Sequence, residues 1–148
     1  KMSFIDKIKT DMYSAMKDKK QYKSIILRSL LAKLKEAEIN SKKPITDKQC
    51  ISIIKTMIKQ RKEAVDLYLE GNRKDLANIE KKECEILEKY IPKMMSESEI
   101  KIIVEKAIND SNATNINEIG KVMSLVMKIG GDRIDGKIAN EFVRELLS

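Results

Sequence analysis

The stretch GDRIDGKI, residues 131–138, matches the pattern of a phosphate-binding loop at all but one of its defined positions. Such a loop reads G-x-x-x-x-G-K-[ST] and holds a phosphate with successive backbone N–H groups, between a strand and a helix. Gly131, Gly136 and Lys137 stand in register, but Ile138 replaces the Ser or Thr that would bind magnesium. The segment therefore either binds a nucleotide or only connects two helices.

The surrounding residues favour a connection between helices. The preceding GKVMSLVMKIG fits a helix better than a strand, and Asp132 and Asp135 would place negative charge beside a bound phosphate. We expect a tight turn in which Gly130 or Gly131 ends one helix and Asp135 caps the next. Gly120 falls inside the helical pattern, where we favour close helix packing over a binding surface as the explanation.

Other residues with catalytic potential are scarce. The chain has no histidine, which removes the commonest general base and the commonest zinc ligand. Cys50 and Cys84 lack metal-site spacing, and both should be reduced because they fall at different levels of an antiparallel helical hairpin. We expect the glutamates between residues 80 and 88 to pair with nearby basic side chains. The sequence accordingly predicts no catalytic residue, no metal site and no cofactor.

Helix-forming residues dominate the chain. Of 148 residues, 42% are hydrophobic, 36% charged and 4% aromatic, with 5 Gly and 2 Pro, and apolar residues recur at helical spacing. This predicts an all-α fold of about seven helices. Gly71 should end the third helix. Capping side chains are expected at Ser3, Thr46 with Gln49, Asn72, Ser96 with Glu99, and Asp135.

The chain divides into two parts that differ in charge. We expect a larger, basic N-terminal helical domain over residues 1–95 and a small three-helix domain over residues 96–148. Residues 1–43 carry 12 Lys or Arg against 5 Asp or Glu, whereas residues 96–148 carry 7 against 9. The formal net charge of +7 therefore originates in the first third of the chain.

A basic end suggests a polyanionic partner, with RNA or DNA first. Because few aromatic side chains are available for base stacking, such a protein should read the shape and charge of RNA. The alternative is a solvated lysine-rich surface, since Lys outnumbers Arg 25 to 5, a bias that an AT-rich genome produces by itself. Phosphate contacts are assigned to Lys17, Lys19, Lys20, Lys23, Arg28, Lys33, Lys35, Lys42 and Lys43.

The C-terminal segment GKVMSLVMKIGGDRIDGKIANEFVRELL resembles the C-terminal signature of the YqeY family and the tail of the B subunit of the tRNA-dependent amidotransferase. Three further stretches fit the family in order, namely LRSLLAKLKEAEI, IKQRKEAVDLY and RKDLANIEKKECEILEKYIPKMMSESEI. The resemblance covers nearly the whole chain. It implies an all-helical fold with a larger N-terminal part and a small three-helix C-terminal part.

The resemblance also implies a relation to glutamine-dependent amidation of misacylated tRNA. In the amidotransferase the catalytic chemistry lies in a separate domain, and the tail, which this chain matches, contacts tRNA. Family members are commonly labelled carbon–nitrogen ligases with glutamine as amido donor, and we interpret that label as inherited from the larger protein. The family loop usually reads K-G-R-A-D-G, so Asp132 and Ile134 are departures, and Asp132 weakens the case for an RNA contact at the loop. The second set of RNA-binding candidates is Lys121, Lys128, Arg133 and Lys137.

Three functions stand as hypotheses. The first is a non-catalytic RNA-binding module with tRNA as the expected ligand. The second is an accessory protein that binds an amidotransferase subunit or a tRNA synthetase. The third is an amidotransferase-like enzyme acting alone, against which the missing histidine and the missing nucleotide loop argue.

Arg61 lies on the apolar side of its helix and has two possible roles. It either binds a recessed phosphate or, as we favour, pairs with Glu80 or Glu83 of the following helix. No segment has the ~20 apolar residues of a membrane span, and Met2 is the expected natural start. We expect a cytoplasmic protein, or an organellar one whose transit peptide has been removed.

Overall fold

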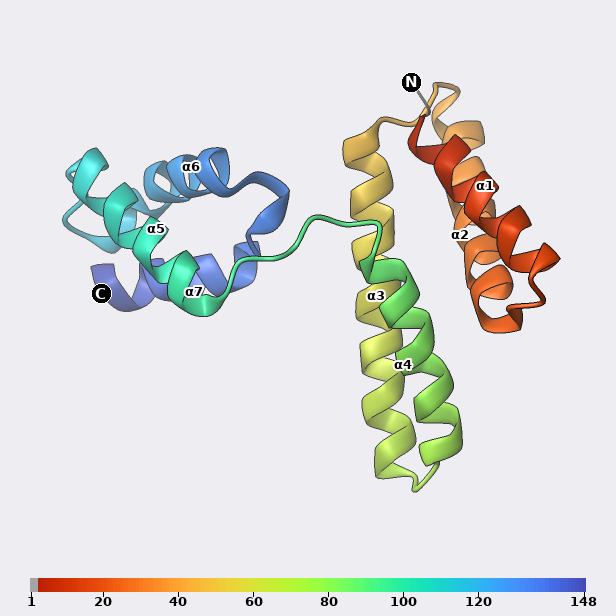
Figure 1. Cartoon of the computed structure of the whole chain (residues 1–148). Helices are drawn as coiled ribbons and strands as arrows, with labels where there is room; N and C mark the ends of the chain where they lie inside the picture. The colour runs from red at the N-terminus through yellow and green to blue at the C-terminus, as the bar shows by residue number, and fades with distance from the viewer. Residues whose placement is uncertain (1–2) are drawn as a thin grey trace. The chain divides into compact units, whose positions relative to one another are not determined.

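A computed structural model describes residues 3–148, so the expected start at Met2 lies outside the described residues. Seven α-helices and two 3-10 helices make up this part of the chain, which contains no strand (Figure 1). The predicted all-α fold is confirmed. The chain divides into two compact units, the first reaching Ile91 and the second spanning Pro92–Ser148. The domain boundary that we place after Met95 stays a prediction.

Four helices form the first unit, and α2 lies at its centre. Its helix α1 packs on α2, while α3 and α4 form an antiparallel hairpin that also contacts α2 (Figure 1). The bounds are α1 (Phe4–Lys17), α2 (Gln21–Ser41), α3 (Asp47–Glu70) and α4 (Lys74–Glu88). One apolar cluster holds the unit together, with fully buried members from all four helices: Ile8, Leu27, Leu30, Leu34, Ile54 and Leu87.

Three α-helices and two 3-10 turns form the second unit. They are α5 (Glu97–Ser111), η1 (Ile116–Glu118), α6 (Ile119–Gly130), η2 (Gly131–Arg133) and α7 (Gly136–Leu147). The three α-helices contact one another and enclose a separate apolar cluster around Ile100, Val104, Val122, Val126 and Val143. Among the helices of residues 3–148, none is both long and apolar enough to cross a bilayer.

Most of the predicted helix starts are present, because capping is a local interaction. Asn72 is the exception, since it has φ 59° and is a left-handed turn residue, while Arg73 is the N-cap residue of α4 and makes no side-chain capping bond. Gly71 ends α3 as predicted, so Asn72, a residue type that tolerates the left-handed conformation, completes the turn. The confirmed caps are Ser3, Thr46 with Gln49, Ser96 with Glu99, and Asp135.

The glycines of α6 and its C-terminus have different roles from those predicted. A Cβ atom at Gly120 would meet no atom within 4 Å, so the packing explanation for this glycine is wrong. A Cβ atom at Gly130 would lie 2.0 Å from Cδ1 and 2.9 Å from Cβ of the buried Ile134. Gly131 follows with φ +53° and ends α6. Ile134, a departure from the family loop, therefore has a packing role against the end of α6.

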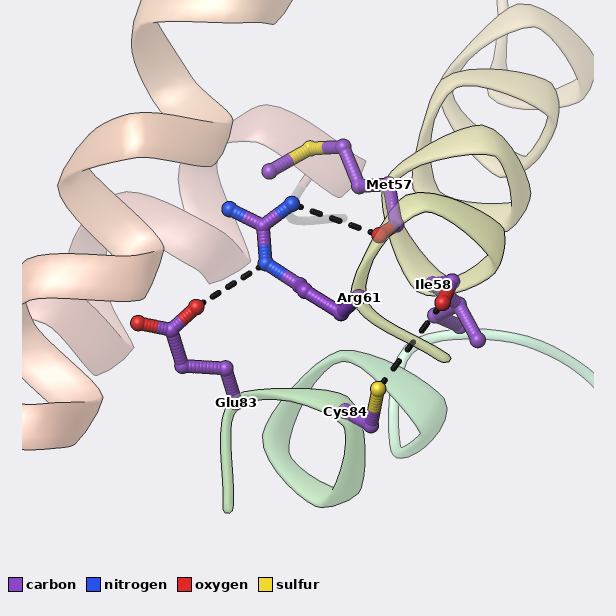
Figure 2. Close-up of polar contacts among 5 residues, drawn as sticks. All are labelled: Met57, Ile58, Arg61, Glu83 and Cys84. Carbon is purple, nitrogen blue, oxygen red and sulfur yellow. Dashed lines mark hydrogen bonds and ion pairs between the residues drawn. The ribbon is translucent and has the colours of Figure 1, made fainter. Parts of the chain in front are cut away.

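Arg61 is held inside the α3–α4 hairpin (Figure 2). Its Nε donates to Oε2 of Glu83 at 3.0 Å and its Nη1 to the carbonyl of Met57 at 3.3 Å. The side chains of Arg61 and Glu83 are only 19% and 16% exposed. The predicted pairing is confirmed, and Arg61 is already engaged within the fold.

The two glycines of α6 provide a first test of this packing. We expect Gly130→Ala to lower the free energy of unfolding by about 1–3 kcal/mol, because the added methyl group cannot avoid the Cβ atom of Ile134. Gly120→Ala, in the same helix, should leave stability unchanged or raise it by up to about 1 kcal/mol. Urea unfolding followed by circular dichroism measures both. Equal losses for the two variants would contradict this account.

The Arg61–Glu83 pair gives a second prediction. Glu83→Gln should cost about 1–3 kcal/mol, because it leaves a half-buried guanidinium without its charged partner. The double variant with Arg61→Met should lose less than the sum of the single losses. Lys62 and Glu88 are the matched control, since they join the same two helices at 3.6 Å but are 66% and 46% exposed. Their coupling in an equivalent cycle should be about 0–1 kcal/mol, and a coupling as large as that of Arg61–Glu83 would refute the role of burial.

Candidate nucleic-acid interface

The turn between α1 and α2 gathers four of the predicted phosphate ligands. Lys17 ends α1, Lys19 and Lys20 form the turn, and Lys23 lies in the first turn of α2. The backbone of Lys20 returns to α1, where its N–H donates to the carbonyl of Ala15 at 2.8 Å. Lys19 has φ 57°, a left-handed conformation that costs a non-glycine residue about 1–2 kcal/mol. The fold therefore brings these four lysine residues to one end of α2.

The N-terminus of α2 adds to this positive potential. Lys20 is the N-cap residue but makes no side-chain capping bond, and no acidic residue occupies the first turn. The first N–H groups of a helix have no partner within the helix, and its dipole places partial positive charge there. The lysines of the turn and the helix end thus favour negative charge at the same place.

An open groove of about 530 Å³ lies between this turn and α4. Its walls combine residues from two helices that are distant in sequence but packed together. Lys82 Nζ stands 4.7 Å from the ring centroid of Tyr22, a cation–π contact across the groove. The groove is lined by Lys19, Lys20, Gln21, Tyr22, Lys23, Lys82, Glu85 and Ile86.

The remaining basic residues of the first set follow α2 away from the groove. Arg28 and Lys35 are seven residues apart and therefore share one face, and Lys42 follows at the helix end. Lys42 lies about 33 Å from Lys20 along the axis, at ~1.5 Å per residue. Lys42, like Lys19, has a positive φ. Lys33 lies on a different side of α2 from Arg28 and Lys35, and Lys43 follows Lys42 beyond the helix, so the nine predicted residues form a cluster at the turn and further cations spread along α2, rather than a single patch.

These cations are available to a ligand. Eight of the nine residues are exposed, and only Lys23 is partly buried. Within residues 3–148, none of the nine takes part in an ion pair. Arg28 makes a weak contact, with Nη2 3.8 Å from the sulfur of Met16. By contrast, Arg61, Lys62 and Arg73 have carboxylate partners.

The second predicted set lies in the other unit and is also exposed. Lys121 and Lys128 are seven residues apart on α6 and share a face. Arg133 has a structural role, because its Nε donates to the carbonyl of Lys93 at 3.0 Å and its own carbonyl accepts the N–H of Met95 at 2.8 Å. These bonds tie the start of the second unit to the GGDR turn. The RNA-binding role of the set stays a prediction.

The glycine-rich segment is built as a connection between helices. The residues before it form α6, and Gly131–Arg133 form a 3-10 turn. Oδ1 of Asp135 accepts the N–H groups of Lys137 and Ile138 at 2.9 and 3.4 Å. A phosphate-binding loop would need such N–H groups free for the phosphate. The interpretation as a turn is therefore confirmed.

Neither thiol is suited to nucleophilic chemistry. Cys50 and Cys84 form no disulfide, as predicted, and both are buried. Burial, aided by Asp47, raises the pKa of the Cys50 thiol to about 11, and burial also raises the pKa of Cys84. The Cys84 thiol donates to the carbonyl of Ile58 at 3.8 Å (Figure 2). Their thiolates, the reactive forms, are therefore rare at neutral pH.

Sequence reasoning missed the contribution of α4 to the basic groove. Lys82, Glu85 and Ile86 read as ordinary positions of an amphipathic helix, and only the packing of α2 on α4 brings them to Tyr22. The local signal that was present is Tyr22 itself, an aromatic residue inside the polar run KDKKQYK.

Comparison with known proteins identifies relatives over nearly the whole chain. The family described as Yqey-like protein matches residues 5–147. The protein named "Altered inheritance of mitochondria protein 41, mitochondrial" from Vanderwaltozyma polyspora is 34% identical over 106 residues, 70% of this chain and 57% of that protein. Proteins of the same name from Clavispora lusitaniae and Lachancea thermotolerans are 30% and 28% identical, over 78% and 93% of this chain and 68% and 73% of their own lengths.

This chain thus spans just over half of the Vanderwaltozyma polyspora protein and about 70% of the other two. The match over residues 5–147 confirms the resemblance to the YqeY family that the C-terminal segment and the three upstream stretches first indicated. The chain belongs to the YqeY family.

Proposed function

We propose that this protein is a non-catalytic module that binds tRNA through the basic surface of its first unit. The observation that carries the proposal is the cluster of exposed lysines at the α1–α2 turn, continued by the cations along α2, none of them paired with a carboxylate within residues 3–148. Phosphate neutralisation by such side chains supplies most non-specific affinity for nucleic acid.

The choice of tRNA rests on the similarity to the tail of the amidotransferase B subunit. In that enzyme the tail contacts tRNA and the amidation chemistry resides elsewhere, so a tail-like chain acting alone would deliver or hold tRNA. We include an association with glutamine-dependent carbon–nitrogen ligases in the proposal. A cytoplasmic location is also part of it, although the relatives are mitochondrial by name; both compartments contain tRNA.

The lysines of the turn provide the test. Changing Lys17, Lys19, Lys20 and Lys23 to Gln should weaken tRNA binding about tenfold or more at low salt. The slope of log affinity against log salt should fall by about 0.7–0.9 for each lysine that contacts a phosphate. Fluorescence anisotropy with labelled tRNA across a salt series measures both quantities, and duplex DNA serves as the competing polyanion.

A matched variant removes the same charge elsewhere. Lys48, Lys74, Lys101 and Lys106 are exposed and lie outside the predicted interface, so their change to Gln should leave affinity and salt slope within about twofold of the wild type. Equal losses of affinity for both variants, or equal binding to tRNA and duplex DNA, would contradict a specific tRNA site. The positive charge would then be a general feature of the protein surface.

A second candidate function, binding of a protein partner, is favoured by the outer face of α2. Ile25 and Ile39 are 54% and 65% exposed, and with Ala32 they recur every seven residues beside the line of Arg28 and Lys35. An amphipathic acidic helix of an amidotransferase subunit or tRNA synthetase would match this face.

The variant Ile25→Ser with Ile39→Ser separates the two functions. It should abolish co-purification with such a subunit while leaving tRNA affinity intact. Retained co-purification would count against this face as a protein-binding surface.

A further inference from the structure

The groove beside the α1–α2 turn contains more than phosphate ligands. Tyr22 is 45% exposed although it sits at the start of a long, well-packed helix, and Lys82 of α4 lies over its ring. Ile86 adds an apolar wall. An exposed aromatic ring bordered by cations is the arrangement by which proteins hold unstacked bases, because every base presents a π face that stacks on it.

We propose that this groove binds one unpaired nucleotide of an RNA strand. The base replaces the Lys82 ammonium over the ring of Tyr22 and contacts Ile86, and Lys19, Lys20 and Lys23 hold the adjoining phosphates. The inference rests on the proposed RNA-binding function and specifies the part of the ligand that enters this site: a single-stranded end or loop rather than a duplex.

The dimensions and charges of the groove support this occupant. Its volume of about 530 Å³ lies in the range of ~300–1,000 Å³ typical of small-molecule sites, whereas a helical duplex presents its bases only at groove edges. Four lysines line the groove against a single carboxylate, that of Glu85. Because Glu85 belongs to α4, the phosphates should lie toward the turn that carries Lys19 and Lys20.

The dipole of α2 also favours a phosphate at the α1–α2 turn. The helix begins at Gln21 without a capping side chain. The N–H groups of its first turn, which include those of Tyr22 and Lys23, therefore have no partner within the helix. A phosphate bound by the turn lysines is stabilised by this helix end, while the base reaches the ring one residue farther along. The base and the phosphate of one nucleotide would thus be held by residues that are neighbours in the sequence.

The experiment compares two tyrosines. Tyr22→Leu should weaken binding of a short fluorescein-labelled single-stranded RNA about fivefold or more, the effect of losing one stacked base, with no change in salt slope because no charge is lost. Tyr22→Phe keeps the stacking surface and should bind as the wild type does. Tyr13→Leu is the matched control, because Tyr13 is 63% exposed on α1 and does not line the groove. The wild type should also bind the single strand more tightly than a duplex RNA of the same length.

The outcomes separate this inference from the function on which it rests. Unchanged binding by Tyr22→Leu, together with loss of tRNA binding when the turn lysines become Gln, would overturn the nucleotide site and leave the tRNA-binding module standing. Equal losses for Tyr22→Leu and Tyr13→Leu would also overturn it, since stacking would then not be localised in the groove. Absence of RNA binding by the wild type at low salt would overturn both and favour the protein partner.

Discussion

The burial of one face of α2 is the constraint on which the first unit depends. Leu27, Leu30 and Leu34 are all but inaccessible and share one cluster with residues of α1, α3 and α4. Because α2 is clamped between α1 and the α3–α4 hairpin, its remaining face and its N-terminal end are left to solvent. The same packing brings the first turn of α2 against α4 and creates the basic groove.

The basic residues of this unit differ in whether they pair with a carboxylate. Arg61 is directed into the hairpin, where Glu83 and the Met57 carbonyl take up its donors. Arg28 and the lysines at the α1–α2 turn stay outside any ion pair of the described chain. The net charge counted from the sequence does not separate paired cations from unpaired ones. Only the unpaired cations remain fully available to a phosphate. Within the first unit, the predicted phosphate ligands at the turn and along α2 therefore belong to the unpaired class.

Features governed by neighbouring residues were predictable from the sequence, and features governed by distant contacts were not. The capping boxes at Thr46 and Ser96 involve partners three residues away, so the spacing alone revealed them. Asn72 was wrongly predicted because asparagine suits both an N-cap and a left-handed turn. The role of Gly130 depends on the packing of Ile134, and the groove depends on the contact of α2 with α4. Eight of the nine basic residues of the first predicted set are exposed and their RNA-binding role stays a prediction, while their arrangement at the turn and along α2 required the length and position of that helix.

Two of these cations occupy positions that oppose stability. Lys19 and Lys42 have φ values of 57° and 58°, where asparagine or glycine would relieve strain. A chain optimised for stability alone would place no lysine at either turn. Thermostabilising substitutions at these two turns would therefore remove positive charge from both ends of α2. Under the proposed function, stability and phosphate affinity would compete at residues 19 and 42.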